Sequence, residues 1–493
     1  MPRSCVPRRV TVISASVGAG HDGAAAELAS RLEAAGFAVD RYDFVDLLPC
    51  GLGRLLSGAY HRLLTLAPAV YQRVYASMGR TGRPGPALRL LLRGARRRTR
   101  RTVGPATVAA VATYPGAGQV LGALRRRGRL DVPVLTYLTD FSVHPLWVAR
   151  GVDVHLAAHA VPAGQARSLG AQGVLVSGPV TNKAFHPVDE AERRAARERL
   201  GLPADRTLAL LVAGSWGVGA VRSAAREIRA GGAAVPVVVC GANKSLLRHL
   251  RADGFAHVRG WESDMPGLMR ACDVLVQNAG GLTSLEAFAT GLPVMSYRCI
   301  PGHGRTNAAA LDEAGLASWV RDPGQLATAI TELATGAEGE RQRAQGLALF
   351  PRGTGPAAVI AAAAARADGR GSAPATVPGA RGTGERTPGI RSSRESAAGA
   401  ASGAGDHAAR SARPVAAPFA PRMRSRNGSP RPALRTAGTA DAARRNPLRN
   451  PATAIALVLT LGLGIGAPVL HAYGAVPGSI SSAAHHFIEE HEL

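Results

Sequence analysis

The stretch VTVISASVGAGHDG, residues 10–23, joins an apolar run to a glycine-rich turn that opens a helix. A second junction of this kind, NAGGLTSLEA at residues 278–287, follows the apolar run at residues 274–276. Glycine lets a backbone approach a ligand closely, and the N–H groups at the start of a helix attract negative charge. Each junction carries one polar side chain that suits a ligand, His21 in the first and Glu286 in the second. Two such junctions in two halves of the chain predict a ligand held between two α/β domains.

Apolar runs alternate with helical stretches in both halves of the chain. In the first half, strands are predicted at residues 10–15, 38–44, 106–112, 132–139, 154–158 and 174–177. In the second half, they are predicted at residues 208–212, 235–240, 257–259, 274–277, 294–297 and 319–320. This alternation is typical of doubly wound parallel sheets, whose ligands bind at the carboxyl ends of the strands. We therefore expect an α/β fold with two domains, residues 8–180 and 181–350.

The remainder of the chain has a different composition. Residues 353–450 consist mainly of Ala, Gly, Pro, Ser and Arg, which cannot bury enough surface to offset the entropy of ordering. We therefore predict a disordered basic tail there. The apolar stretch at residues 452–473 is about long enough to span a bilayer, although its glycines and Pro468 leave a surface-bound or buried segment open. With arginines before it and glutamates after it, the positive-inside rule predicts domains on the cytoplasmic face of the cell membrane and a C-terminus outside.

The net charge of +25 comes almost entirely from arginine, since Lys183 and Lys244 are the only lysines. Aromatic residues make up only 4% of the chain, so platforms for stacking bases are not expected, and we predict no nucleic-acid partner. Clustered arginine suits an anionic membrane surface better. The five cysteines are scattered and form no C-x-x-C pair, which indicates a reducing compartment and no structural zinc.

The densest basic run is RLLLRGARRRTRR, residues 89–101. A solvated helix face is the usual explanation of a charge run, but leucines beside arginines are typical of an interfacial membrane helix. The predicted membrane patch comprises Arg89, Arg93, Arg96, Arg97, Arg98, Arg100 and Arg101.

Each motif has an alternative interpretation. GAGHDG at residues 18–23 also fits the G-x-G-x-x-G of a dinucleotide site, with Asp40 and Asp43 near the distance of its ribose acid, and it fits a plain tight turn. GSWGVG at residues 214–219 would cradle a diphosphate on backbone N–H groups but lacks the G-K-[ST] ending of a Walker A loop. TSLE at residues 283–286 fits a capping box, in which Glu286 would bond a backbone donor instead of a ligand.

One loop collects ionisable groups at the end of a predicted strand. The sequence TDFSVHPLW, residues 139–147, brings Asp140, His144 and Trp147 together. A solvated loop would explain it, but an acid and an imidazole beside a cleft perturb each other's pKa, which is typical of functional sites.

Together these motifs resemble glycosyltransferase family 28 in its lipid branch, the monogalactosyldiacylglycerol synthases and processive diacylglycerol glucosyltransferases, over about residues 8–335. The resemblance implies a GT-B fold, in which two Rossmann-like domains hold a nucleotide sugar between them. It implies His21 as the catalytic base, Asp140 as the acid of the T-D loop and Glu286 as the ribose ligand. The other implied donor-binding residues are Gly214, Ser215, Gly280, Gly281, Thr283, His303 and Asn307. The implied acceptor-binding residues are Gly18, Gly20, His144 and Trp147. The chain departs from the family at His303 and Gly304, where a Gln and an acid usually lie near the donor sugar.

The expected activity is an inverting transfer of a hexose from a UDP-sugar to a diacylglycerol-type membrane lipid, in glycolipid biosynthesis. No D-x-D motif is present, so we expect no metal and no cofactor, with UDP-hexose as co-substrate. The remaining alternatives are a polyprenyl-linked or soluble acceptor, a dehydrogenase, and a membrane-tethered protein that binds nucleic acid.

Overall fold

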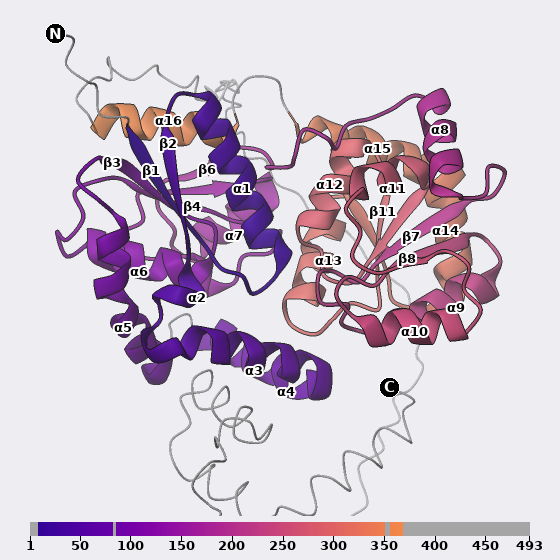
Figure 1. Ribbon diagram of the computed structural model, residues 1–493, viewed down its shortest axis with the longest axis horizontal. Coiled ribbons are helices and arrows are strands. Elements are labelled where there is room, and N and C mark those ends of the chain that lie inside the picture. Colours follow the sequence, from indigo (N-terminus) through magenta and orange to yellow (C-terminus); the bar gives the residue numbers. More distant parts are fainter. Residues whose placement is uncertain (1–7, 82–84, 351–354, 368–493) are drawn as a thin grey trace, which may run out of the picture. The chain divides into compact units, whose positions relative to one another are not determined.

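The computed structural model describes residues 8–81, 85–350 and 355–367, which form two parallel sheets and their helices (Figure 1). The N-terminal sheet has the strand order β2-β1-β3-β4-β5-β6. Its strands are β1 (Arg9–Ser14), β2 (Ala38–Asp43), β3 (Thr107–Ala112), β4 (Val134–Tyr137), β5 (Val154–Ala157) and β6 (Val174–Val176). The C-terminal sheet has the order β12-β11-β10-β7-β8-β9. Its strands are β7 (Leu208–Val212), β8 (Val235–Val239), β9 (Val258–Arg259), β10 (Val274–Gln277), β11 (Val294–Tyr297) and β12 (Ala317–Val320).

Every strand that the apolar runs predict is present, with ends that differ by at most two residues. All the strand pairings in both sheets are parallel. Strands that are covered on both faces read as continuous apolar runs, which is why the pattern locates them so well. The expectation of two doubly wound, Rossmann-like domains is therefore confirmed.

Helices connect the strands in both domains. Those of the first half are α1 (Ala19–Ala34), α2 (Phe44–Leu47), η1 (Pro49–Gly51), α3 (Leu52–Leu66), α4 (Pro68–Thr81), α5 (Pro86–Thr102), α6 (Pro115–Arg125), η2 (Pro145–Trp147) and α7 (Ala160–Ser168). Those of the second half are α8 (Glu190–Leu200), α9 (Val221–Gly231), α10 (Lys244–Ala252), α11 (Met265–Ala271), α12 (Leu282–Thr290), α13 (His303–Glu313), η3 (Pro323–Gln325), α14 (Leu326–Thr335) and α15 (Ala337–Ala348). A last helix, α16 (Pro356–Ala367), follows them.

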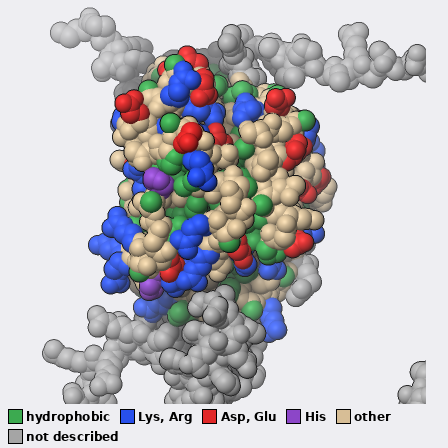
Figure 2. Space-filling model, turned by 90° about the vertical axis from the view of Figure 1, so that its right-hand side faces the viewer, with side chains coloured by type: hydrophobic (Ala, Val, Ile, Leu, Met, Phe, Trp, Pro, Cys, Tyr) green, Lys and Arg blue, Asp and Glu red, His purple; other side chains and the backbone are tan. Residues whose placement is uncertain are grey.

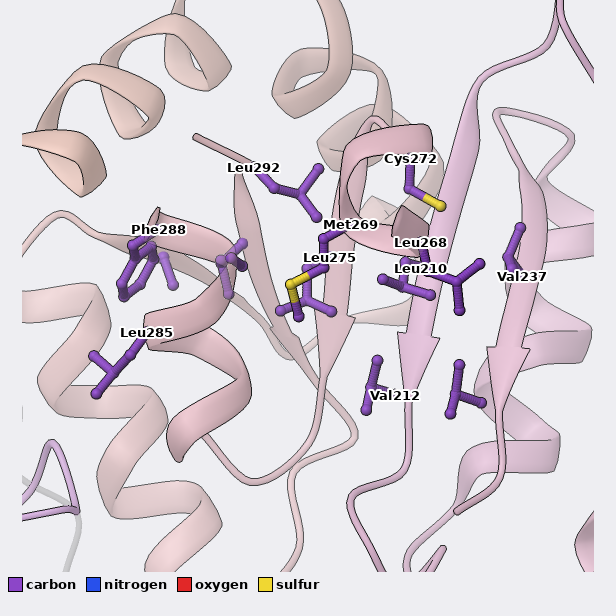
Figure 3. Close-up of a cluster of buried hydrophobic side chains, with 14 of the residues drawn as sticks. Leu210, Val212, Val237, Leu268, Met269, Cys272, Leu275, Leu285, Phe288 and Leu292 are labelled. Carbon is purple, nitrogen blue, oxygen red and sulfur yellow. The ribbon is translucent and has the colours of Figure 1, made fainter. Parts of the chain in front are cut away.

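The cores lie between each sheet and its helices. Strand β3 is buried along its whole length, and β7 and β10 are buried likewise. Figure 3 shows this packing in the C-terminal domain, where strand side chains meet those of α11 and α12 (Leu210, Val237, Leu275, Leu268, Met269 and Phe288). These packed cores hold the loops at the carboxyl ends of the strands in place.

Helix α16 corrects one expectation. Residues 356–367 fall within the predicted disordered tail, but they form a helix that packs on the core of the N-terminal domain, against β3 and α1. Its buried stripe contains Ile360 among small residues (Ala357, Ala363 and Ala364). Alanine has the highest helix propensity, and apolar residues three to four positions apart share one helix face. The composition that predicts disorder therefore also encodes a short packed helix at residues 356–367.

The packing of α16 predicts that chains truncated after this helix and before it differ in stability. A chain ending at Ala367 should unfold at the same urea concentration as the full chain, whereas a chain ending at Phe350 should lose about 2–4 kcal/mol of unfolding free energy. The loss corresponds to exposing Ile360 and the side chains it covers. Urea titrations followed by circular dichroism measure the difference, and Ile360→Ala in the longer chain is the control. Equal midpoints for both chains would contradict the packing role of α16.

The rest of the predicted tail, residues 368–450, and the predicted membrane span, residues 452–473, lie outside the described residues. Within the described residues, none of the helices has the length and apolar character needed to cross a bilayer.

Candidate active site

A cavity of about 670 Å³ is lined by loops at the carboxyl ends of strands from both sheets. Thirteen of the fourteen catalytic, donor-binding and acceptor-binding residues expected from the sequence line it: Gly18, Gly20, His21, Asp140, His144, Trp147, Gly214, Ser215, Gly280, Gly281, Thr283, Glu286 and His303. Residues more than 280 positions apart in the chain are thus brought to one site, as expected for sheets that present their carboxyl ends to a ligand.

Asn307 is the exception. It is fully buried behind the cavity wall, where its Oδ1 accepts a hydrogen bond from Ser142 N–H at 2.7 Å and its Nδ2 donates to the Ala279 carbonyl at 3.0 Å. Asn307 does not line the cavity, and its contact with the donor stays a prediction. Its side chain instead ties the loop after β4 to the loop after β10.

His21 lies in the first turn of α1, with its ring held from one side. Its Nδ1 is 2.9 Å from the Thr113 carbonyl oxygen and 2.8 Å from the Thr139 hydroxyl. A carbonyl oxygen can only accept, so in the neutral ring this contact places the proton on Nδ1 and leaves Nε2 with its lone pair. The ring also lies edge-on to Tyr114, with centroids 5.3 Å apart. An imidazole oriented in this way can take a proton at Nε2.

Asp140 is oriented by a buried tryptophan. The indole N–H of Trp147 donates to Asp140 Oδ2 at 3.0 Å, and only 1% of Trp147 is exposed. Trp147 was expected to bind the acceptor, but its polar atom is engaged with Asp140. It therefore fixes the direction of the carboxylate in the cavity.

Glu286 is not part of a capping box. Helix α12 starts at Leu282 with Gly281 as its N-cap, so Glu286 lies in the second turn, too far along to bond the N-cap. The structure thus rejects the capping interpretation. Burial raises the pKa of Glu286 to about 7. No hydrogen bond or ion pair to its carboxylate is found within the part of the chain that the structure describes. A half-buried carboxylate that lines a cavity without a partner is suited to a ligand's hydroxyl groups.

The turn before α12 uses its glycine Gly280 for structure. The N–H groups of Ala279 and Gly280 both donate to the side-chain oxygen of Gln277, so Gly280 does not offer its N–H to a ligand as expected. Gly280 has a φ of +70°, and a Cβ there would lie 2.7 Å from that of Asn307. The first N–H groups of α12 itself have no intrahelical acceptor and remain for an anion.

Gln277 was not predicted from the sequence to be a site residue. The only indication was that this polar residue ends an otherwise apolar strand, β10. Its amide donates to the Ser296 hydroxyl at 2.7 Å, which fixes its oxygen toward the glycine turn.

The dinucleotide alternative lacks a free ribose acid. Asp43 caps α2 by accepting from Val45 N–H at 2.8 Å, and Asp40 pairs with Arg9 at 2.6 Å. Both acids at β2 are therefore engaged in structural contacts.

The larger part of the cavity is apolar. Helices α3, α4 and α5 line it with side chains that include Leu56, Leu63, Val74, Met78, Leu88 and Leu92. Two further tryptophans, Trp216 and Trp261, also line the cavity and were not assigned from the sequence. One end of the cavity is thus polar and the other can accommodate hydrocarbon.

The polar end is not basic. Among the described lining residues, the acids are Asp140, Glu262 and Glu286, and neither Lys nor Arg is present. Helices α1, α12 and α13 all begin at this end, since Ala19, Leu282 and His303 line it. Negative charge on a ligand would therefore be stabilised by helix N-termini. No group of three or more metal-ligating side chains occurs in the described ranges.

The predicted membrane patch lies on α5, with its arginines and leucines mostly on different faces. Arg89, Arg93, Arg97, Arg98, Arg100 and Arg101 are exposed, whereas Arg96 is half-buried. Burial, followed by neighbouring arginines, lowers the pKa of Arg96. Three of the four leucines turn inward to the cavity, and only Leu90 is largely exposed, at 70%. The leucines we expected at a membrane surface thus line the cavity instead. The face drawn in Figure 2, by contrast, carries basic and acidic side chains scattered among one another.

Comparisons with known proteins agree with the motifs. Residues 212–335 match the family model of glycosyl transferases group 1. A processive diacylglycerol beta-glucosyltransferase of Bacillus mycoides is 28% identical over 41% of this chain and 54% of its own length. Its counterpart in Bacillus licheniformis is 27% identical over 43% of this chain and 57% of its own length. The chain therefore spans about half the length of the curated relatives it matches. The expected resemblance to lipid glycosyltransferases is confirmed.

The solved structures that are similar to this chain are more distant in sequence. Os79 from O. sativa, in complex with U2F and trichothecene, is 13% identical with a TM-score of 0.49 over 73% of this chain and all of its own. MurG from Acinetobacter baumannii is 18% identical with a TM-score of 0.41 over 72% of this chain and 97% of its own.

Proposed function

We propose that this chain, which carries a glycosyl transferase group 1 domain at residues 212–335, transfers a hexose from a UDP-sugar to a diacylglycerol-type lipid. The observation that carries the proposal is one cavity with two unlike ends. Its polar end combines His21, Asp140 and Glu286 with helix N-termini, which suits a nucleoside diphosphate sugar. Its apolar end, formed by α3, α4 and α5, suits the acyl chains of an acceptor. The curated relatives named for diacylglycerol support the same acceptor class.

The reaction is a single displacement with inversion. Nε2 of His21 accepts the proton of the acceptor hydroxyl while its oxygen forms a bond to the anomeric carbon. The bond from that carbon to the diphosphate breaks, and the nucleoside diphosphate leaves with the electron pair. The N-terminus of α12 stabilises the charge that develops on it, without a metal. Asp140, held by Trp147, is the second candidate base, and Glu286 binds the ribose hydroxyls.

We also propose that the enzyme works at the cytoplasmic face of a membrane. The exposed arginines of α5 would attract anionic lipid headgroups, each contributing about 1 kcal/mol near the surface. Residues 452–473, outside the described part, would add a single span with the C-terminus outside. Such a span would keep the protein in the membrane fraction in high salt, and release by salt alone would contradict it.

The test is a labelled-donor screen on lipid vesicles. Dioleoylglycerol in vesicles with anionic lipid should become labelled by one of UDP-glucose, UDP-galactose or UDP-N-acetylglucosamine, with the anomeric configuration inverted. The rate should persist in EDTA, and it should fall in neutral vesicles or high salt, because surface charge is screened within a Debye length.

Each failure has a separate meaning. Absence of UDP binding by calorimetry would contradict the glycosyltransferase proposal itself. UDP binding with labelling of only a polyprenyl-linked or soluble acceptor would contradict the diacylglycerol assignment. Retention of configuration, or loss of rate in EDTA, would contradict the mechanism.

A further inference from the structure

Helices α3 and α4, residues 52–81, form a pair that stands apart from the strands of their own domain. Within that domain, α3 packs mainly on α2 and η1, and α4 packs mainly on α3. The chain enters the pair through two successive residues with positive φ, Cys50 at 54° and Gly51 at 69°. A left-handed conformation at a non-glycine residue is sparsely populated, which marks this turn as a special junction.

The first contact of the pair with the C-terminal domain is aromatic. Trp216 belongs to the glycine loop after β7, and its indole lies against α3. Its ring centroid is 4.9 Å from that of His61 and 5.7 Å from that of Tyr60. Trp216 also packs against the buried cluster that Leu63, Leu64 and Tyr71 form. The loop that would cradle a diphosphate is therefore anchored to α3.

The second contact joins α4 to the loop before α13. The Tyr71 hydroxyl is 3.1 Å from His303 Nδ1, and the Gly302 N–H donates to the side-chain oxygen of Gln72 at 2.5 Å. A Cβ at Gly302 would lie 2.6 Å from the Tyr71 ring, so the approach is close. Burial raises the pKa of Tyr71 and lowers the pKa of His303, so both groups are neutral at pH 7 and the bond does not depend on charge.

The same two helices line the apolar end of the cavity. Leu63 of α3 and Tyr71, Val74 and Met78 of α4 all face it. One element therefore touches both donor-side loops and the compartment for the acceptor. A ligand that orders the loop after β7 or the loop before α13 would therefore also order the α3–α4 side of the cavity.

We propose that the α3–α4 pair couples the two substrates: nucleotide bound at the loops after β7 and β11 stabilises the docked pair and thereby completes the acyl-chain compartment. Donor binding then raises the affinity for the acceptor. The coupling is reciprocal, because the acceptor must raise the affinity for the donor by the same factor. It requires that the nucleotide bind these loops more tightly when Trp216 and Gly302 hold them against the pair. Trp216 and Tyr71 are thus positioning residues. This inference rests on the proposed function.

The test measures binding of a short acceptor, dioctanoylglycerol, to the full chain by calorimetry with and without saturating UDP. In the wild type, UDP should tighten acceptor binding by about 5-fold or more, within the range typical of coupled sites. The ratio of the acceptor affinity with UDP to that without UDP should fall toward one in Tyr71→Phe and in Trp216→Leu. The matched control is Tyr297→Phe, which removes a hydroxyl bonded to Glu227 at 2.7 Å in the C-terminal domain and should keep the wild-type ratio.

A second measurement does not depend on the acceptor. UDP alone should slow amide hydrogen exchange in residues 52–81 of the wild type, and the effect should be smaller in Trp216→Leu. Independent binding of UDP and dioctanoylglycerol in the wild type would overturn the coupling while leaving the proposed function intact. Protection by UDP that is confined to the C-terminal domain would overturn it as well. Absence of UDP binding would instead refute the proposed function.

Discussion

His21→Ala is expected to slow sugar transfer by about 10²–10⁴-fold, the usual range for loss of a general base. The Thr113 carbonyl holds the proton on Nδ1 of His21, so Nε2 is the proton acceptor that the variant lacks. The affinity for UDP should change by less than about two-fold, because the donor contacts come from the other domain. A drop in kcat at constant donor affinity separates loss of chemistry from loss of binding.

Single-turnover kinetics and calorimetry with UDP make these two measurements. The matched control is His186→Ala, which removes an exposed histidine that does not line the cavity and should keep the wild-type rate. If the His21→Ala enzyme works at close to the wild-type rate, His21 is not the base and Asp140 is the remaining candidate. In that event Asp140→Asn should show the large loss.

Glu286→Gln is expected to weaken UDP binding by about ten-fold or more at pH 8, since a hydrogen bond to a charged group contributes about 1.5–3 kcal/mol. Ribose hydroxyls would bond the ionised carboxylate most strongly, and the pKa of Glu286 is about 7 without ligand. The affinity of the wild type should therefore fall as the pH drops from 8 to 6. The affinity of the variant should fall less over that range, because only the terminal phosphate of UDP then titrates. Calorimetric titrations across this range measure both, and pH-independent binding by the wild type would contradict the ribose role.

The same substitution should act on stability in the opposite direction. Burial raises the pKa of Glu286 from 4.5, so the folded state binds this proton more tightly than the unfolded state. The stabilisation from the protonated form is fully present below pH 4.5 and is lost as the pH rises through about 7. At pH 8 the wild type therefore keeps an ionised, half-buried carboxylate, and Glu286→Gln should be more stable by up to about 3 kcal/mol. Urea titrations at pH 5 and pH 8 test this, and a variant that is less stable at both values would point to a structural role.

The sequence by itself determined the two sheets and thirteen of the residues that line the cavity. Buried parallel strands must be continuous apolar runs, and a glycine turn between strand and helix sets where the polar residue beside it will lie. His21 and Glu286 follow such turns, so their positions at the carboxyl ends of β1 and β10 could be predicted from local pattern alone.

Only the tertiary structure decided what several of these residues do, because the deciding partner lies far away in the chain. The Thr113 carbonyl, 92 positions from His21, selects the tautomer. Contacts across the domains buried Asn307 behind the wall. The start of α12 at Leu282, and not at Ser284, removed Glu286 from a cap that the sequence also allowed. The inward turn of the α5 leucines and the docking of α16 likewise depend on a core that only the folded chain provides, since local composition specifies a helix but not the surface against which it packs.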